Sequence, residues 1–125
     1  MTSRSSSGDR STVAKGRAAE DTVARYLESF GFEILERNVR SGRLEIDLVA
    51  RRGALIVVCE VRSRKTAAFG HPAETIDRAK QLRIRRSAAA LIEQRGWRGS
   101  VRFDVATLVG DGRGGTQLEY YEAAF

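Results

Sequence analysis

Two neighbouring segments of this chain, joined by a very short connection, constrain the fold most. Residues 44–50 alternate in part between apolar and charged positions, and residues 54–62 are apolar on both faces for most of their length. The Arg-Arg-Gly connection at residues 51–53 is short enough for a tight turn, so the two segments predict a β-hairpin. A strand that is apolar on both faces is typical of the centre of a sheet. We therefore expect a sheet covered on both sides.

Apolar periodicity predicts a helix on each side of this hairpin. In the first helix the apolar positions are Ala19, Val23, Tyr26, Leu27 and Phe30. Ser11 or Thr12 is the expected cap, and Gly31 the expected end. Pro72 suits the first turn of the second helix, which should run to about Gln94 before Gly96 stops it.

The remaining segments complete a single domain. Strands are predicted at 32–39, 101–109 and 116–121, with turns at 38–42 and 110–115 and a loop at 63–71. The order of elements is therefore α-β-β-β-α-β-β, which implies an α/β fold with a mixed sheet flanked by helices. Residues 11–125 would form this domain, and the Ser- and Arg-rich residues 1–10 a flexible N-terminal arm.

Composition restricts the class of protein and of partner. The chain has 125 residues, with 22 Lys and Arg against 16 Asp and Glu, and this net charge of +6 favours polyanions such as nucleic acid or an anionic membrane surface. The same balance also occurs in mildly basic soluble proteins. One cysteine excludes an internal disulfide, and one cysteine with one histidine is too little for structural zinc. Residues 1–10 resemble no secretory signal and no apolar run is long enough to span a membrane, so we expect a cytoplasmic protein.

Charged residues of the predicted hairpin should gather on one face. Side chains alternate along a strand, so Glu45 shares a face with Asp47, and Glu60 shares a face with Arg62. A register that pairs 51 with 54 sets 45 opposite 60 and 47 opposite 58. All four charged groups would then converge, whereas a slip by one residue would mix charges into the apolar face.

Carboxylates held this close need compensation, because like charges opposite one another destabilise a sheet. A divalent cation supplies it, and Mg²⁺ prefers one or two carboxylates with waters and phosphate oxygens. Glu20, on the flank of the first helix's apolar stripe, could lean over the sheet and reach the same cluster. The alternative is that Glu45 and Glu60 pair with arginines at a solvated sheet end, with Glu20 at an exposed helix edge.

Five short blocks carry a resemblance to a known family. They are residues 16–20 (GRAAE), 44–48 (LEIDL), 60–64 (EVRSR), 70–72 (GHP) and 102–105 (RFDV). In order and spacing they resemble the YraN family of small bacterial proteins, which is similar to Holliday-junction resolvases and to PD-(D/E)xK nucleases. The resemblance implies a restriction-endonuclease-like core and a metal-dependent nuclease that acts on DNA, branched DNA included. A homodimer is expected by analogy with resolvases.

The resemblance also implies roles for individual residues. Asp47 and Glu60 match the two acidic motif positions and would hold Mg²⁺ or Mn²⁺, and Glu20 matches the helix-one acid that assists them, with Glu45 nearby. Two positions depart from the family pattern: Leu44 replaces the usual glycine, and Arg62 replaces the usual lysine.

The Arg62 departure leaves three interpretations open. Arginine can stabilise negative charge on phosphate, but it is a poor proton acceptor. Arg62 would then act as an electrostatic substitute, or Lys80, which lies within the apolar stripe of the second helix, would take over. The third interpretation is a catalytically inactive module that only binds nucleic acid.

Basic residues outside this cluster are candidates for phosphate contacts. The second helix is rich in arginine, which indicates either a phosphate-binding surface or a solvated face. The candidate contacts are Arg51, Arg52, Arg64, Lys65, Arg78, Arg83 and Arg86. Few exposed aromatic residues are evident, which favours duplex or branched DNA over single strands. Arg102 and Asp104 share a strand face and are expected to pair with each other.

Overall fold

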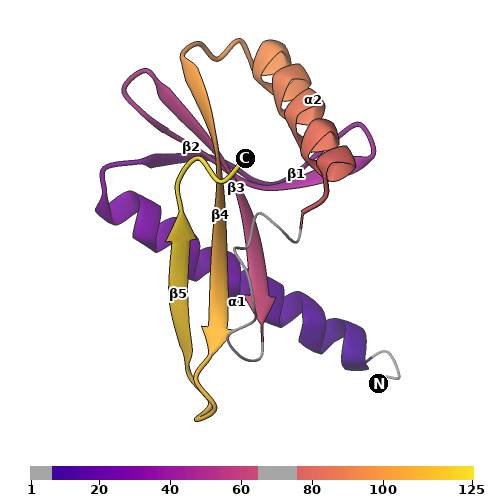
Figure 1. The fold of residues 1–125 in the computed structure, drawn as a ribbon, viewed down its shortest axis with the longest axis vertical. Coiled ribbons are helices and arrows are strands. Elements are labelled where there is room, and N and C mark those ends of the chain that lie inside the picture. The colour runs from indigo at the N-terminus through magenta and orange to yellow at the C-terminus, as the bar shows by residue number, and fades with distance from the viewer. Residues whose placement is uncertain (1–6, 65–75) are drawn as a thin grey trace.

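The computed structural model describes residues 7–64 and 76–125, with side chains from residue 16 onward. Its elements follow the predicted order α-β-β-β-α-β-β (Figure 1). They are α1 (Ser7–Ser29), β1 (Glu33–Ser41), β2 (Leu44–Arg52), β3 (Leu55–Arg64), α2 (Arg78–Arg95), β4 (Ser100–Gly110) and β5 (Thr116–Tyr121). Neither described helix is long and apolar enough to cross a membrane.

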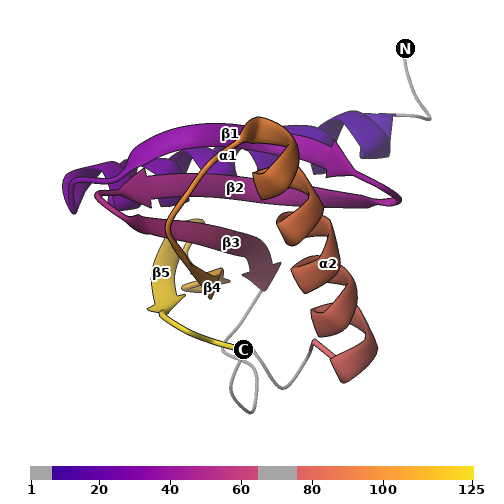
Figure 2. The same cartoon turned by 90° about the horizontal axis from the view of Figure 1, so that it is seen from above.

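The five strands form one mixed sheet in the order β1-β2-β3-β4-β5. All neighbouring strands pair antiparallel except β3 and β4, which are parallel. The connection from β3 to β4 contains α2, as a parallel pair requires a crossover. The fold class predicted from the sequence, an α/β domain with a mixed sheet flanked by helices, is confirmed (Figure 2).

Each helix covers its own apolar face of the sheet. Val23 and Leu27 of α1 pack with Val57 and Cys59 of β3, whereas α2 packs with Ile56 and Val58 from the same strand. Strand β3 is therefore buried on both faces, as its continuous apolar sequence predicts.

Both helices begin at residues other than those expected. Helix α1 begins at Ser7, before the expected caps, so residues 7–10 of the predicted arm belong to the helix. Residues 1–6 lie outside the described residues. Helix α2 begins at Arg78, and the prediction that it starts at Pro72 is wrong. Asp77 caps it, because the Asp77 carboxylate accepts a hydrogen bond from the Lys80 backbone N–H at 2.7 Å.

Glycines end the helices as predicted. Gly96 adopts φ 72° and donates its N–H to the last turn of α2, which is the usual left-handed helix end. Gly31, with φ 86°, likewise follows α1.

The hairpin register differs by two residues from the expected one. The turn consists of Gly53 and Ala54, so Arg52 pairs with Leu55 and Leu48 with Cys59. Gly53 has φ 60°, a conformation suited to a two-residue hairpin turn. Because side chains alternate with period two, this shift keeps the predicted faces of the paired residues.

Strands β1 to β4 each extend beyond their predicted ends. Strand β1 runs through the expected turn at 38–42 to Ser41, and β3 continues to Arg64, into the expected loop. The Gly70-His-Pro block, and the rest of residues 65–75, lies outside the described residues.

Candidate active site at the parting of two strands

The candidate site lies where the β2–β3 ladder ends. The last pair of the ladder is Leu48 with Cys59, and Asp47 and Glu60 are the next residues along each strand. The backbone N–H of Val61 donates a hydrogen bond to the Asp47 carboxylate at 2.8 Å. The Asp47 side chain therefore accepts the hydrogen bond that, in a regular ladder, the Val61 N–H would donate to a backbone carbonyl of β2.

Strand β2 changes face at the same point. Ile46 packs in the α2-side core, with Leu44 against it, but Leu48 packs in the α1-side core. Residues two apart on a regular strand would share a face. Alternation along residues 44–50 predicts that Leu44, Ile46 and Leu48 lie on one side, opposite Glu45 and Asp47. The structure shows that this prediction is wrong, because the strand is irregular at Asp47.

This irregularity separates Glu45 from the predicted cluster. Glu45 lines a cavity of about 330 Å³ together with Gly16, Arg17, Glu20 and Asn38. The expectation that Glu45 converges with Asp47, Glu60 and Arg62 on one face fails for Glu45. Glu45 instead faces helix α1, where it lines the same cavity as Glu20.

Asp47 and Glu60 form a close acidic pair. Burial, the negative charge of Glu60 and a hydrogen bond shared with Glu60 raise the pKa of Asp47 to about 7, and the charge of Glu20 contributes further. The hydrogen bond from Val61 opposes this rise, since it stabilises the carboxylate. Asp47 is therefore partly protonated near neutral pH.

Lys80 reaches this pair from the first turn of α2. Its Nζ lies 3.3 Å from Oε2 of Glu60, whose side chain is only 14% exposed. Lys80 itself is partly exposed, at 39% of its side chain, so it touches both the pair and solvent. The position of Lys80 within the apolar stripe of α2 carries its stem past the core toward the sheet.

Glu20 is held beside the pair by a residue that was not singled out from the sequence. Glu20 is only 8% exposed, and its carboxylate accepts a hydrogen bond from Asn38 Nδ2 at 2.7 Å. Asn38 stands where the predicted strand 32–39 overlaps the predicted turn 38–42, and an asparagine is typical of a turn, so its type gave no signal of a site.

The residues present fit a divalent cation only through a pair of carboxylates. Within residues 16–64 and 76–125, whose side chains the structure describes, no three His, Cys, Asp or Glu side chains stand close enough together to hold an ion. The predicted ligand set of Asp47, Glu60 and Glu20 is therefore not assembled as a triad. A pair suffices for Mg²⁺, which commonly takes its other ligands from water and phosphate.

Arg62 lies on β3, two residues beyond Glu60 and on the same face by alternation. It is half-buried and pairs in register with Thr107 of β4, whose buried hydroxyl makes no hydrogen bond within the described part of the chain.

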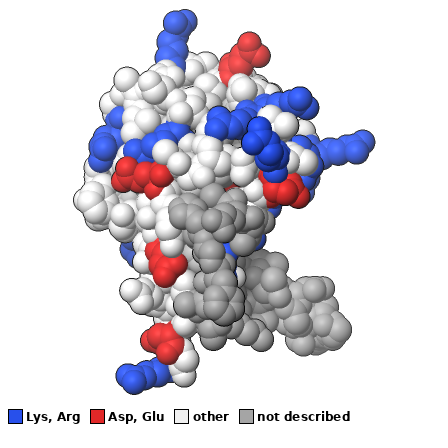
Figure 3. Space-filling model, in the orientation of Figure 1, with Lys and Arg blue, Asp and Glu red and all other residues white. Residues whose placement is uncertain are grey.

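The predicted phosphate contacts divide into separate groups. Arg78, Arg83 and Arg86 are exposed on α2, the helix of Lys80, and basic side chains gather over that region of the surface (Figure 3). Arg51 and Arg52 lie instead at the β2–β3 turn, roughly 15 Å along the strand from Asp47. Lys65 lies outside the described residues, and Arg64 ends β3.

Some predicted surface properties need correction. Phe30 was placed in the buried stripe of α1, but it is 55% exposed beside the β2–β3 turn, where its carbonyl accepts a hydrogen bond from Arg52. The Arg102–Asp104 pair is confirmed, with two hydrogen bonds of 2.9 Å.

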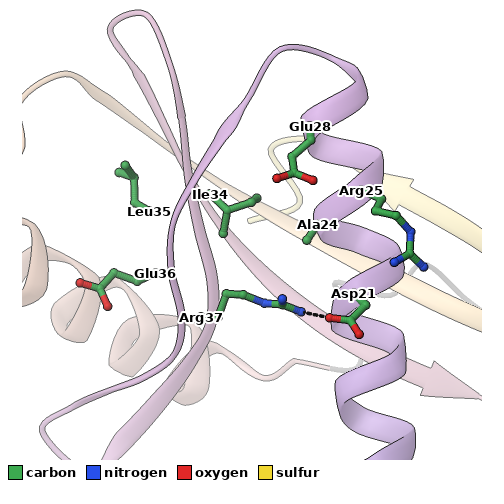
Figure 4. Close-up of a pocket in the computed structure, with 8 residues that line it drawn as sticks. All are labelled: Asp21, Ala24, Arg25, Glu28, Ile34, Leu35, Glu36 and Arg37. Carbon is green, nitrogen blue, oxygen red and sulfur yellow. Dashed lines mark hydrogen bonds and ion pairs between the residues drawn. The ribbon is translucent and has the colours of Figure 1, made fainter.

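A larger cavity, of about 560 Å³, lies between α1 and β1 (Figure 4). Acidic and basic side chains of both elements line it, and Arg37 points across it to an ion pair with Asp21. None of the residues predicted to carry chemistry lines this groove.

Comparison with known proteins assigns the family. The model of "Uncharacterised protein family UPF0102" matches residues 19–108. A UPF0102 protein of Moorella thermoacetica is 45% identical over 95 residues, covering 75% of this chain and 79% of the relative. One of Beutenbergia cavernae is 40% identical over 112 residues, covering 89% and 95%. One of Cytophaga hutchinsonii is 37% identical over 99 residues, covering 79% and 88%. The matched region contains Glu20, Asp47, Glu60 and Lys80, and the chain belongs to the UPF0102 family, the YraN family expected from its motifs.

Proposed function

We propose that this protein is a metal-dependent nuclease that hydrolyses phosphodiester bonds in DNA, with branched DNA as its substrate class, on a restriction-endonuclease-like core. One observation carries the proposal: Asp47 and Glu60 lie side by side where two strands part, and Lys80 Nζ lies 3.3 Å from Glu60. Two acids that can hold a metal ion, and a lysine that can contact a phosphate, are suited to metal-dependent phosphodiester hydrolysis.

Asp47 and Glu60 would hold Mg²⁺ or Mn²⁺. The bound ion would stabilise charge on the scissile phosphate and lower the pKa of an attacking water. The Val61 N–H fixes one oxygen of Asp47, and the carboxylate also shares a hydrogen bond with Glu60, which a bound ion would replace. Glu60 is oriented by Lys80 from the opposite side. Both carboxylates are thus held before any substrate arrives, which reduces the entropy cost of assembling the site.

Lys80 is our choice for the role that the family's motif lysine would fill. An ammonium this close to Glu60 can donate hydrogen bonds to a phosphate oxygen. Once deprotonated, it can also accept a proton from water, which arginine cannot. Arg62, on the same strand face as Glu60, is retained as a second phosphate contact. The geometry supports Lys80 over the two other interpretations of the Arg62 departure.

The surface next to the site supports a nucleic-acid substrate. Arg78 and Arg83 are exposed on the same helix as Lys80, so phosphates along a strand could contact them while one phosphate occupies the site. Association would then depend strongly on salt concentration.

A second candidate function is a catalytically inactive nucleic-acid-binding module. Two observations favour it: Arg62 replaces the motif lysine, and no group of three metal-ligating side chains occurs among the described side chains of residues 16–64 and 76–125. This alternative requires DNA binding that is sensitive to salt and unaffected by metal.

One experiment separates the two functions. Purified protein is incubated with branched, nicked and linear DNA in Mg²⁺, in Mn²⁺ and in chelator. We expect metal-dependent cleavage that Asp47→Ala abolishes and Arg113→Ala, in the exposed β4–β5 turn, leaves intact. Cleavage that persists in Asp47→Ala, or binding of all three DNAs without any cleavage, would refute the nuclease proposal.

A further inference from the structure

Asn38 interrupts the β1–β2 ladder directly opposite Asp47. The pairs of this ladder run from Arg37 with Leu48 to Val39 with Ile46 and omit the position between them, which by count would join Asn38 to Asp47. Asn38 adopts φ 51° in the middle of a strand. Among residues with a side chain, asparagine tolerates this left-handed conformation best.

The amide of Asn38 is directed away from the ladder, to the helix. Its Nδ2 donates to the buried Glu20 carboxylate at 2.7 Å, and the preceding residue, Arg37, makes an ion pair with Asp21. Consecutive residues of β1 thus contact consecutive residues of α1. The Arg37–Asp21 ion pair is exposed, whereas the Asn38–Glu20 hydrogen bond lies in the cavity that Glu20 shares with Glu45.

From these contacts we infer that Asn38 is a positioning residue with two roles. Its backbone conformation interrupts the pairing of β1 with β2 at Asp47. Its side chain holds Glu20 next to the acidic pair, where Glu20 would be a third oxygen ligand of the ion or would accept a hydrogen bond from metal-bound water. The inference rests on the proposed nuclease function and adds a residue to it.

The backbone role and the side-chain role of Asn38 can be separated. Glycine adopts positive φ freely, so Asn38→Gly keeps the strand geometry and removes only the amide. Arg37→Ala is the matched control, because it breaks the neighbouring α1–β1 contact and leaves Glu20 with its hydrogen bond.

The measurement is Mn²⁺ affinity by calorimetry without DNA, together with kcat and KM for cleavage. Partners that orient metal ligands commonly change affinity or activity by about tenfold to a hundredfold. We expect Asn38→Gly to weaken Mn²⁺ binding and lower kcat by about tenfold or more, with KM for DNA unchanged. Arg37→Ala should change neither.

A double-mutant cycle tests whether Asn38 acts through Glu20. In a Glu20→Gln background, Asn38→Gly should have no further effect on Mn²⁺ affinity. Glu20→Gln also tests the contact without altering the backbone at residue 38, should the glycine variant fold poorly, and it should weaken Mn²⁺ binding by itself.

Three results overturn the inference in different ways. Native affinity and kcat in Asn38→Gly and in Glu20→Gln refute the role of Asn38 while the nuclease proposal stands. An equal loss in both backgrounds shows that Asn38 acts by another route. A native protein that neither binds Mn²⁺ nor cleaves DNA refutes the nuclease proposal, and the inference with it.

Discussion

Lys80, in the first turn of α2, lies with its Nζ 3.3 Å from Oε2 of Glu60 on the central strand β3. The two residues come from elements on either side of the undescribed segment 65–75, and they meet because α2 packs across the face of the sheet on which Glu60 lies.

The first prediction concerns Lys80. Lys80→Ala should lower the single-turnover cleavage rate by about a hundredfold or more, the usual effect of removing a group that transfers a proton. Lys80→Arg should restore little, because arginine keeps the positive charge but cannot accept a proton. Arg113→Ala is the control for loss of one positive charge. A cleavage rate in Lys80→Ala within a few-fold of native would assign this role elsewhere, with Arg62→Ala as the next variant to measure.

The second prediction concerns stability and pH. The pKa of Asp47 is about 7 in the folded protein and near 3.8 when unfolded, so the native state binds more protons between these values. Stability contributed by this group is therefore present in acid and is lost as pH rises toward 7. Asp47→Asn should raise the free energy of unfolding at pH 8 by a few kcal/mol, and the gain should shrink toward pH 4.

Urea denaturation at several pH values measures this gain. Asp21→Asn is the control of opposite sign, because the Arg37 hydrogen bond lowers the pKa of Asp21. Stability from Asp21 is present above its unfolded pKa and is lost as pH falls, so this substitution should bring no gain at pH 8. A native-like pH profile in Asp47→Asn would show that the acidic pair carries no strain.

The third prediction concerns metal uptake. A carboxylate must lose its proton before it binds a cation, so Mn²⁺ affinity should fall about tenfold per pH unit below the Asp47 pKa of about 7. Calorimetry at pH 6 in two buffers of different ionisation enthalpy should detect close to one proton released per ion. Equal heats in both buffers would contradict the predicted release of a proton.

The fourth prediction concerns the exposed arginines of α2. Each duplex phosphate that a protein neutralises adds about −0.9 to the slope of log affinity against log salt. Replacing Arg78, Arg83 and Arg86 by alanine should reduce the magnitude of this slope by roughly one unit for each arginine that binds a phosphate, and it should weaken binding of all duplex sequences alike. Arg51→Ala, at the distant hairpin turn, should change the slope less. The reverse ranking would locate the DNA on the hairpin side.

The fifth prediction concerns a buried carboxylate outside the site. Asp104 is fully buried and accepts hydrogen bonds from Arg102, from Tyr120 and from the backbone N–H of Ala123. Asp104→Ala leaves the Arg102 charge and two donors without their acceptor, which should cost about 3–5 kcal/mol of stability. Tyr120→Phe, which removes one donor only, should cost about 1 kcal/mol. Thermal unfolding in the absence of metal compares the two variants.

The sequence allowed the hairpin, the order of elements and the placing of Asp47 and Glu60 on one face of it to be predicted, because each depends on local periodicity. The predicted register set Glu45 opposite Glu60, whereas the observed register continues from Leu48–Cys59 to Asp47 and Glu60. The observed register differs by two residues from the predicted one, but a shift of two keeps each paired side chain on its predicted face. Glu45 was misplaced because alternation assumes a regular strand, and the irregularity at Asn38 and Asp47 leaves no mark in the apolar pattern.

The contact of Lys80 with Glu60 depends on how α2 crosses the sheet. Periodicity placed Lys80 within the inward stripe, but its partner is set by the packing of the helix, which no local pattern encodes. The start of α2 was misjudged for a related reason: Pro72 and Asp77 are both acceptable near a helix start, and the capping hydrogen bond at Asp77 decides between them.

The hydrogen bond from the Val61 main chain to Asp47 does not depend on the side chain at position 61. Nineteen of the twenty amino acids bring an N–H to position 61, and only proline lacks one. Protein engineers could therefore vary the side chain there, to tune the packing beneath α1, while the anchor of the acid survives.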